Sequence, residues 1–562
     1  MTFYPKLKHG ELPVGSRKHG NYFQLGIWPY YPEVPLFKVL RNTAVLMPET
    51  PTILYPRKMT IREIDDLSDR LATALADLGV KKGNTVGLFM WNSPEFVGAF
   101  FGVLKTGATV TALNPSFKEK DAEHQLEDSE SVAVIFDDGL YPILRSIQGK
   151  LPKLKNKIAV GDGKHPGFYS FEKLIRKYPA NPPDVKIDPK ADLAVIQYTS
   201  GTTGLPKGCM LTHYNMMSCA FQLFLMHGLQ TTRDDIILAH LPFYHIYGMT
   251  VIMCTSVFFG LRMVIQKRFD PQEFLELIQK FKVTIVTTVM PVITGLTQFP
   301  DFLKQYDLSS VRYFNNGAVP IVLETARKFE GLTGVTVSQG YGLSETSAVS
   351  HTNPLSQIKL DSVGVPIPDT EQKIVDIETG TKEMPPGEVG EVIVRGPQVM
   401  MGYWKRPEDT AETLRDGWLY TGDIGKIDKD GYLYIVDRKK EIIKCMGFTI
   451  GPADLEAVLL QHSCVRDCAV VGKPDSAAGE IPKAYVTLQP GAKTTKEDLM
   501  KFVAEKVAGY KRIREVEFVD AIPRSMSGKV LRREFIEKEC RLSQAKDKKT
   551  LREYVRPRGQ AT

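Results

Sequence analysis

Val86-Gly-Leu-Phe-Met90, Ser93-Pro94-Glu95 and Gly107-Ala-Thr-Val-Thr-Ala-Leu113 follow one another in the chain, and together they decide the fold. The first and third segments are short apolar runs of the kind that form buried strands. The middle segment begins a helix that runs to about Leu104, with serine as the N-cap and with proline and an acidic residue in the first turn. A strand, a helix and a strand in this order form a βαβ unit, which predicts a parallel sheet covered by helices.

The same alternation continues on both sides of this unit. Before it, apolar residues recur at helical spacing, and Gly79 is placed to end that helix. These apolar residues are Ile64, Leu67, Leu71, Leu75 and Leu78. After it, strands are predicted at residues 132–136, 193–198, 283–288 and 335–339, and helices over 271–281 and up to about residue 329. Residues 1 to about 340 therefore have an α/β pattern.

The pattern changes near residue 370. Strand-like runs with Pro-Gly and Asp-Gly turns between them indicate an antiparallel, β-rich segment, and beyond residue 440 the pattern becomes α+β. A chain of 562 residues is also too long for one hydrophobic core. We expect a large α/β N-terminal domain, with parallel sheets covered by helices and a β-rich subdomain, and a small α+β C-terminal domain.

The composition is that of an ordinary globular protein. A formal net charge of +7, from 72 Lys and Arg against 65 Asp and Glu, suits anionic ligands such as nucleotides without requiring a nucleic-acid partner. The seven cysteines include no C-x-x-C pair, which favours reduced thiols in a cytoplasmic protein. The most apolar stretch, residues 249–265, is too short and too interrupted to span a bilayer, and residues 1–10 lack the apolar segment of a secretory signal.

The segment Tyr198-Thr-Ser-Gly-Thr-Thr-Gly-Leu-Pro-Lys-Gly208 follows a predicted strand and is dense in phosphate-binding chemistry. Glycines let the backbone approach an anion, hydroxyls donate to it, and a lysine supplies charge. The residues expected at the anion are Thr199, Ser200, Gly201, Thr202, Thr203, Gly204 and Lys207. The glycine spacing differs from a Walker A loop. A flexible surface loop is the alternative, although such loops seldom concentrate these residue types.

This loop resembles the phosphate loop of the adenylate-forming superfamily, which includes acyl-CoA synthetases, 4-coumarate–CoA ligases and firefly luciferase. The resemblance extends from about residue 35 to residue 540, and four further segments match the family's motifs in order. These segments are Gln339-Gly-Tyr-Gly-Leu-Ser-Glu-Thr346, Tyr420-Thr-Gly-Asp-Ile-Gly425, Asp437-Arg-Lys-Lys-Glu-Ile-Ile-Lys-Cys-Met-Gly-Phe448 and Pro523-Arg-Ser-Met-Ser-Gly-Lys-Val530. A fatty-acyl-CoA ligase is the member that the chain resembles most.

The resemblance implies a role for several residues. Tyr341 would present an aromatic face to adenine, and Glu345 would hold the magnesium ion that accompanies ATP. Asp423 would accept hydrogen bonds from the ribose hydroxyls, and Arg438 would reach the ribose or a phosphate. Lys529 would bridge the α-phosphate and the acid's carboxylate as charge redistributes. The other cofactor-binding positions that the resemblance implies are Gly317, Gln339, Gly340, Gly342, Ser344, Lys440, Lys444 and Gly447.

The acid-binding end is expected at two further segments. Pro242-Phe-Tyr-His-Ile-Tyr-Gly248 resembles the segment that lines the acyl pocket, with His245 near the carboxylate and with Phe243 and Tyr247 as walls. Asn315-Asn-Gly-Ala-Val-Pro320 stands where relatives carry a Ser-Gly-Ala-type segment, so its two asparagines depart from the family pattern. Lys529, His245 and Glu345 form the expected catalytic set.

The resemblance therefore implies an AMP-forming acid–thiol ligase that uses ATP, Mg²⁺ and coenzyme A, with a medium- or long-chain fatty acid as the preferred substrate. An aryl-propenoate such as 4-coumarate is the alternative substrate. A non-catalytic acid- or nucleotide-binding protein on the same fold is the alternative function, although Lys529, Glu345 and Asp423 are all retained.

The implied domain organisation follows the family. Residues 1–436 would bind ATP and the acid, with the β-rich subdomain at about 365–436. Residues 437–440 would be the hinge of a mobile lid domain at residues 441–562. The sequence leaves open whether the protein forms a homodimer or contacts a membrane surface.

Overall fold

The structure is a computed structural model, and it describes residues 31–199, 206–227, 231–446, 448–475, 478–524, 530–539 and 541. The chain divides into two compact units. The first comprises Met1–Lys373, Ile393–Thr421 and Asp428–Leu433, and the second comprises Ile374–Val392, Gly422–Ile427 and Tyr434–Thr562. In the described part of the chain, no helix is long and apolar enough to cross a membrane.

The predicted βαβ unit lies at the centre of the first unit's first sheet. β3 (Thr85–Phe89) and β4 (Thr109–Ala112) pair in parallel, and α4 (Pro94–Lys105) connects them. The Ser93 hydroxyl caps α4 by accepting a hydrogen bond from the backbone N–H of Phe96 at 3.0 Å. Helix α3 (Ile61–Asp77) packs so closely on α4 that a Cβ added at Gly98 would lie 2.5 Å from Leu67 Cδ2. This close approach explains a glycine inside a helix.

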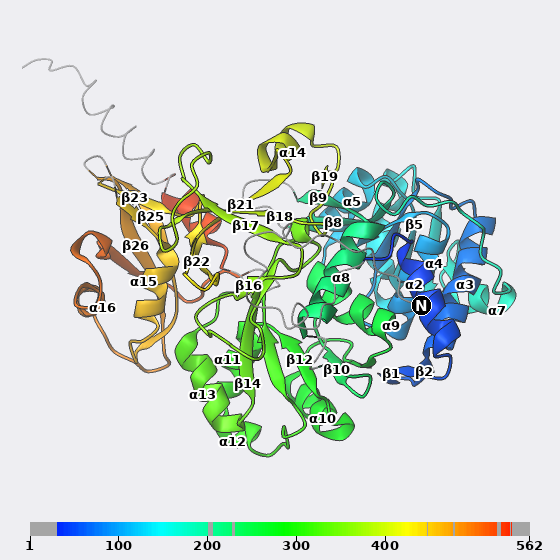
Figure 1. The fold of residues 1–562 in the computed structure, drawn as a ribbon, viewed down its shortest axis with the longest axis horizontal. Coiled ribbons are helices and arrows are strands. Elements are labelled where there is room, and N and C mark those ends of the chain that lie inside the picture. The colour runs from blue at the N-terminus through cyan, green and yellow to red at the C-terminus, as the bar shows by residue number, and fades with distance from the viewer. Residues whose placement is uncertain are drawn as a thin grey trace, which may run out of the picture. The chain divides into compact units, whose positions relative to one another are not determined.

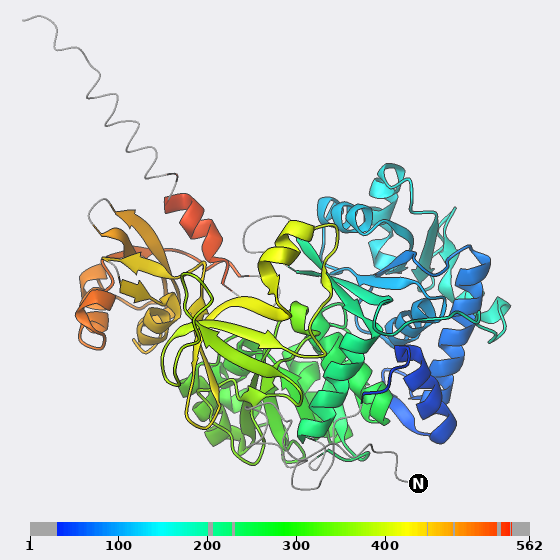
Figure 2. The same cartoon turned by 45° about the horizontal axis from the view of Figure 1, so that its top comes forward.

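The first sheet has eight strands in the order β19-β9-β8-β4-β3-β5-β6-β7, and its middle strands are blue to cyan in Figure 2. The other strands are β5 (Ser131–Asp137), β6 (Asn156–Val160), β7 (Tyr169–Ser170), β8 (Leu193–Thr199), β9 (Lys207–Thr212) and β19 (Gly402–Tyr403). From β8 to β7 all neighbours are parallel, whereas β9 runs antiparallel to both β8 and β19. The associated helices are α5 (Glu119–Asp128), α6 (Tyr141–Ile147) and α7 (Phe171–Lys177).

The second sheet has nine strands in the order β16-β15-β14-β13-β12-β10-β11-β1-β2 (Figure 1). Its strands are β1 (Pro51–Tyr55), β2 (Met59–Thr60), β10 (Ile236–Ala239), β11 (Arg262–Ile265), β12 (Ile285–Thr288), β13 (Tyr313–Asn316), β14 (Thr336–Tyr341), β15 (His351–Thr352) and β16 (Val365–Pro366). From β1 to β14 the neighbours are parallel. Helices α10 (Pro271–Phe281), α11 (Met290–Gln298), α12 (Pro300–Leu303) and α13 (Leu323–Thr333) accompany them.

Further helices belong to the first unit's α/β part, and one prediction needs correction there. These helices are α2 (Leu36–Leu46), α8 (His213–His227), the π-helix η3 (Tyr247–Cys254) and α9 (Thr255–Phe259). Helix α13 continues to Thr333 rather than ending near Phe329, because the first residue that adopts left-handed backbone is Gly334, with φ of 71°. The predicted α/β fold is thus confirmed.

A third sheet has the strand order β17-β18-β21-β20, with β22 beside β21. Its strands are β17 (Glu371–Val375), β18 (Gly390–Arg395), β20 (Leu414–Arg415), β21 (Trp418–Ile427) and β22 (Leu433–Arg438), and α14 (Pro407–Thr413) precedes β20. This strand-rich stretch is where the sequence predicts the β-rich segment.

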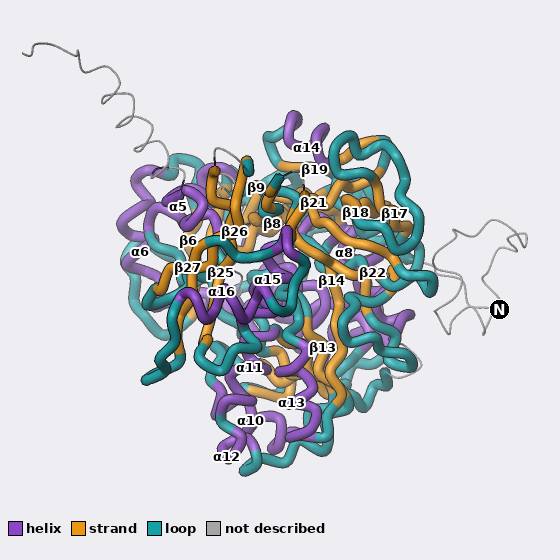
Figure 3. The backbone as a smooth tube through the Cα atoms, turned by 90° about the vertical axis from the view of Figure 1, so that its left-hand side faces the viewer, coloured by secondary structure: helices purple, strands orange, loops and turns teal. Residues whose placement is uncertain are grey.

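In the second unit, a mixed sheet has the order β24-β23-β26-β25, with β27 beside β26. Its strands are β23 (Ile443–Cys445), β24 (Phe448–Ile450), β25 (Val465–Asp475), β26 (Gly479–Leu488) and β27 (Glu515–Phe518). Helices α15 (Pro452–Leu459) and α16 (Lys496–Ala504) lie beside this sheet (Figure 3). Their residues Leu455 and Leu499 are fully buried in the core of this unit. The predicted small α+β part is confirmed.

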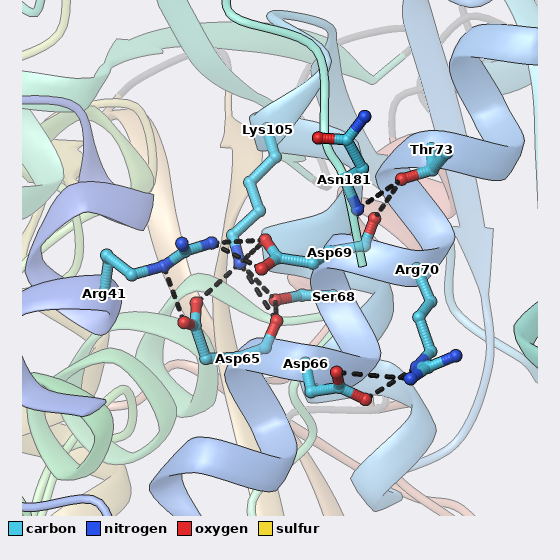
Figure 4. Close-up of polar contacts among 9 residues, drawn as sticks. All are labelled: Arg41, Asp65, Asp66, Ser68, Asp69, Arg70, Thr73, Lys105 and Asn181. Carbon is cyan, nitrogen blue, oxygen red and sulfur yellow. Dashed lines mark hydrogen bonds and ion pairs between the residues drawn. The ribbon is translucent and has the colours of Figure 1, made fainter. Parts of the chain in front are cut away.

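A group of charges, in which Lys105 and two carboxylates are buried, joins α2, α3 and α4 (Figure 4). The Lys105 ammonium, 2% exposed, lies 2.6 Å from carboxylate oxygens of both Asp65 and Asp69, and 2.7 Å from the Ser68 hydroxyl. The Arg41 guanidinium contacts the same two carboxylates at 2.6 and 2.5 Å. Two cations thus balance two anions that burial would otherwise penalise.

Replacing Lys105 with methionine should lower the free energy of unfolding by about 3–5 kcal/mol, because the two carboxylates then keep only Arg41 as a cation. Urea unfolding followed by circular dichroism measures this change. Lys150→Met is the matched control, because Lys150 is 64% exposed in its pair with Glu123 and should contribute less than about 1 kcal/mol. Equal effects of the two substitutions would contradict the assignment of Lys105 as a buried structural cation.

Candidate active site

The antiparallel pair β8–β9 holds the two ends of the predicted phosphate loop together. Thr199, the last residue of β8, is opposite Lys207, the first residue of β9, and the Thr199 hydroxyl donates to the Lys207 carbonyl at 3.5 Å. Because β8 continues the parallel part of the sheet, the loop leaves from the carboxyl edge of the strands, where α/β folds bind ligands. The other residues expected at the anion lie outside the described residues. They are Ser200, Gly201, Thr202, Thr203 and Gly204.

The Lys207 side chain has two neighbours from a distant part of the sequence. Its ammonium forms an ion pair with Asp409 in α14 and lies 5.1 Å from the centre of the Tyr403 ring in β19. The Lys207 and Asp409 side chains are 29% and 28% exposed, so an anion can compete for the lysine from solvent. Lys207 is therefore held at the edge of the sheet in a position that suits phosphate.

Glu345 lies in the short 3₁₀ turn Ser344–Thr346 that follows β14. Its Oε1 accepts a hydrogen bond from the Tyr403 hydroxyl at 2.7 Å, and its backbone carbonyl accepts one from the Met400 N–H at 2.8 Å. Burial, together with the charge of Glu345, raises the pKa of the Cys209 thiol well above its usual value. Burial also raises the pKa of Tyr403, with the same carboxylate adding to the rise. Both neighbours therefore stay protonated and act as donors toward Glu345.

The rest of this motif is tightly packed beside Glu345. It comprises Gln339, Gly340, Tyr341, Gly342 and Ser344. A Cβ added at Gly342 would lie 2.0 Å from the Ala348 carbonyl oxygen, so only glycine fits there. Ala348 itself has a φ of 115°, a strained conformation of the kind that occurs at functional sites. The Tyr341 ring lies 5.8 Å from the His351 ring.

A Mg²⁺ ion that arrives with a nucleotide suits Glu345. Such an ion is usually held by one or two carboxylates together with the phosphates of the ligand. Within the described ranges, no group of three or more His, Cys, Asp and Glu residues could hold a metal ion. Glu345 accepts hydrogen bonds from the Tyr403 hydroxyl and the Cys209 thiol, and a carboxylate can accept about four, so capacity for a metal ion remains.

The structure defines how His245 is held. Asn92, which the sequence analysis missed, donates to the carbonyls of Ala239 and Leu241 at 3.2 and 2.8 Å. Its Oδ1 accepts from the Phe243 N–H at 2.7 Å, so one side chain sets the path of the chain that leads to His245. Phe243 is fully buried against Phe96 and belongs to the core. The expected role of Phe243 as a wall of the acyl pocket stays a prediction.

The His245 ring has a defined tautomer. The backbone N–H of Tyr247 donates to Nδ1 at 3.2 Å, so the neutral ring carries its proton on Nε2. Burial lowers the pKa of His245 to about 4, so the ring is neutral at pH 7. His245 thus offers a neutral N–H donor, which suits an oxygen atom of a carboxylic acid.

Tyr247 connects His245 with the segment that carries the two asparagines. The Tyr247 hydroxyl donates to the Asn315 carbonyl at 3.4 Å, and a Cβ added at Gly317 would lie 2.6 Å from the same hydroxyl oxygen. The Oδ1 atoms of Asn315 and Asn316 are both buried, and no described residue donates to them. Buried oxygens usually have a donor, so each of these two oxygens has the capacity to accept a hydrogen bond from a ligand or from water.

In the second unit, Asp423 in β21 and Arg438 at the end of β22 lie together. Their Oδ1 and Nε atoms are 2.6 Å apart, and the Asp423 side chain is 4% exposed. Lys440 and Lys444 are exposed, and the Lys444 backbone N–H donates to Glu480 at 2.7 Å. Gly447 and Lys529 lie outside the described residues. The nucleotide-binding roles of these six predicted site residues stay predictions.

Comparison with known proteins adds independent findings. A family model described as "AMP-binding enzyme" matches residues 40–404, and one described as "AMP-binding enzyme C-terminal domain" matches residues 454–529. The chain is 37% identical over 539 residues to a long-chain-fatty-acid–CoA ligase of Bacillus subtilis, covering 90% of this chain and 95% of that protein. It is 38% identical over 490 residues to 4-coumarate–CoA ligase 1 of Petroselinum crispum, covering 84% and 88%.

Solved structures agree with these matches. The anthranilate CoA ligase AuaEII in complex with anthranoyl-AMP has a TM-score of 0.83 and 28% identity, covering 92% of this chain and 99% of that chain. ATP-bound MatB from Rhodopseudomonas palustris has a TM-score of 0.81 and 28% identity, covering 90% and 98%.

The tautomer and the charge of His245 can be tested by NMR of ring-labelled histidines, with His245→Gln identifying the signal. That signal should stay that of a neutral, Nε2-protonated ring from pH 8 to pH 5.5. Because the unfolded ring binds a proton near pH 6.5 and the folded one only near pH 4, the folded protein should lose stability as pH falls below about 6.5. A titration midpoint near pH 6.5 would contradict the buried, neutral assignment.

Proposed function

Because the chain belongs to the family of AMP-binding enzymes and is an acid–thiol ligase of the adenylate-forming type, we propose that it activates an apolar carboxylic acid, a medium- or long-chain fatty acid. The observation that carries this proposal is the segment after His245. There the π-helix η3 begins at Tyr247, and Met249 and Met253 in it are fully buried. Methionine side chains adapt to flexible apolar ligands, and π-helices occur frequently at functional sites.

The chemistry requires little covalent work from the protein. A carboxylate oxygen bonds to the α-phosphorus of ATP and pyrophosphate leaves; the thiol sulfur of coenzyme A then bonds to the acyl carbon and AMP leaves. Catalysis consists of positioning the reactants and neutralising charge. His245 would donate from Nε2 to the acid's carboxylate, and Lys207 would exchange Asp409 for a phosphate. Mg²⁺ bound by Glu345 would neutralise phosphate charge.

An aryl-propenoic acid with a phenol, such as 4-coumarate, is the second candidate substrate, and one specific observation favours it. The buried Oδ1 atoms of Asn315 and Asn316 have no donor among the described residues. A buried acceptor that lacks a donor costs about 1–3 kcal/mol. A substrate hydroxyl that reached one of these oxygens would recover that energy, whereas a fatty acyl chain would not.

The proposal is tested by measuring pyrophosphate release and thioester formation for a panel of acids. If the substrate is a fatty acid, kcat/KM should rise about fourfold for each added methylene, because each buried methylene contributes about 0.8 kcal/mol. The rise should stop where the pocket ends. If the phenol is recognised, 4-coumarate should exceed cinnamate, which lacks the hydroxyl, by about tenfold or more.

Two variants complete this test. Asn315→Leu should remove any preference for 4-coumarate over cinnamate while leaving fatty acids within a few-fold of wild type. Lys529→Ala should abolish pyrophosphate release with every acid if the predicted role of Lys529 is right. A wild-type protein that binds ATP but releases pyrophosphate with no acid would instead be a non-catalytic binding protein.

A further inference from the structure

We propose that Tyr403 is a positioning residue of the ATP site, which orients Glu345 for the nucleotide's Mg²⁺ ion and supports Lys207 for the phosphates. This inference rests on the proposed function of Glu345 and Lys207. Tyr403 lies outside every motif that the sequence analysis singled out.

The hydroxyl of Tyr403 sets the orientation of the Glu345 carboxylate. It donates to Oε1 at 2.7 Å, and Tyr403 is only 7% exposed. A carboxylate oxygen can only accept, so the phenol hydroxyl is the donor in this contact. The hydroxyl and the Cys209 thiol use two of about four acceptor positions, so capacity for a metal ion remains on the carboxylate.

The ring of Tyr403 supports Lys207 at the same time. The lysine ammonium lies 5.1 Å from the ring centre, a distance typical of a cation–π contact. The ammonium also forms an ion pair with Asp409, so Lys207 rests between an aromatic face and a carboxylate. When a phosphate replaces Asp409 as the anionic partner, the ring remains in place below the ammonium.

The strand register explains why one side chain can reach both groups. Tyr403 is directly opposite Cys209 in the antiparallel pair β19–β9, so the two side chains are on the same face of the sheet. Lys207 precedes Cys209 by two residues in β9 and shares that face. Backbone hydrogen bonds from Trp404 to Gly208 at 2.8 Å and from Met401 to Met210 at 3.0 Å hold Tyr403 in this register.

A residue that orients a metal ligand is distinguishable from one that only ties two segments together. Loss of a hydrogen bond to a metal ligand typically weakens metal binding about 10- to 100-fold. A merely structural hydrogen bond would lower stability without changing how nucleotide binding depends on Mg²⁺. The Mg²⁺ dependence of nucleotide binding is therefore the informative measurement.

The experiment is calorimetric titration of the full chain with α,β-methylene-ATP, which cannot release pyrophosphate, across a range of Mg²⁺ concentrations. Tyr403→Phe keeps the ring under Lys207 and removes only the hydroxyl. We expect the Mg²⁺ concentration for half-maximal binding to rise about 10- to 100-fold, with nucleotide affinity in EDTA within twofold of wild type. Tyr403→Leu also removes the ring, so its affinity in EDTA should fall as well.

A matched control and a double variant sharpen the result. Tyr432→Phe removes another buried tyrosine hydroxyl, which donates to the Gln357 carbonyl at 2.7 Å, and should leave the Mg²⁺ dependence unchanged. In a Glu345→Gln background, Tyr403→Phe should cause no further shift, because the hydroxyl acts through the carboxylate. Additive shifts would overturn the proposed coupling.

Other outcomes are equally decisive. A Tyr403→Phe variant with wild-type Mg²⁺ dependence would overturn this inference and leave the proposed function intact. A wild-type protein that binds no nucleotide at any Mg²⁺ concentration would overturn both. If Tyr403→Phe does not fold, Glu345→Gln replaces it: unchanged Mg²⁺ dependence there would remove Glu345 as the metal ligand and the proposal with it.

Discussion

The antiparallel pairing of β9 with β8 on one side and β19 on the other is the constraint on which the candidate site depends. It places Thr199 opposite Lys207, the two described ends of the predicted phosphate loop, at the carboxyl edge of the parallel strands. It also sets Tyr403 opposite Cys209, and from there the Tyr403 hydroxyl reaches Glu345 in the turn after β14. The backbone register of one sheet thus determines the positions of the Lys207 ammonium and the Glu345 carboxylate, which belong to two different sequence motifs.

The site combines few charges with several donors that burial keeps neutral. The pKa of His245 is lowered to about 4, while the pKa values of Tyr403 and Cys209 are raised, so all three remain uncharged at pH 7. Charge is concentrated in Lys207 and Glu345, where a nucleotide and its metal ion would bring opposite charges. A site of this kind can receive a highly charged ligand without burying unpaired ions beforehand.

The sequence predicts those features that depend on neighbours in the chain. Ser93 before an apolar run identifies the start of α4, and the motif that contains Glu345 lies within eight contiguous residues. A local sequence pattern does not identify Tyr403, Asp409 or Asn92. Their roles arise from contacts between segments that are far apart in the chain. The antiparallel pairing of β9 with β8 and β19 is a long-range feature of the same kind. The expected domain limits and the roles of Gly447 and Lys529 stay predictions of the sequence alone.

The most direct measurement is the exchange of labelled pyrophosphate into ATP with a single acid and without coenzyme A. Formation of an acyl-adenylate is reversible, so it transfers label only when the acid is present. We expect exchange that requires the acid, needs no coenzyme A and disappears in Glu345→Gln. Thioester formation by the wild-type protein with no detectable exchange would contradict an adenylate intermediate, and with it the roles proposed for Lys207 and Glu345.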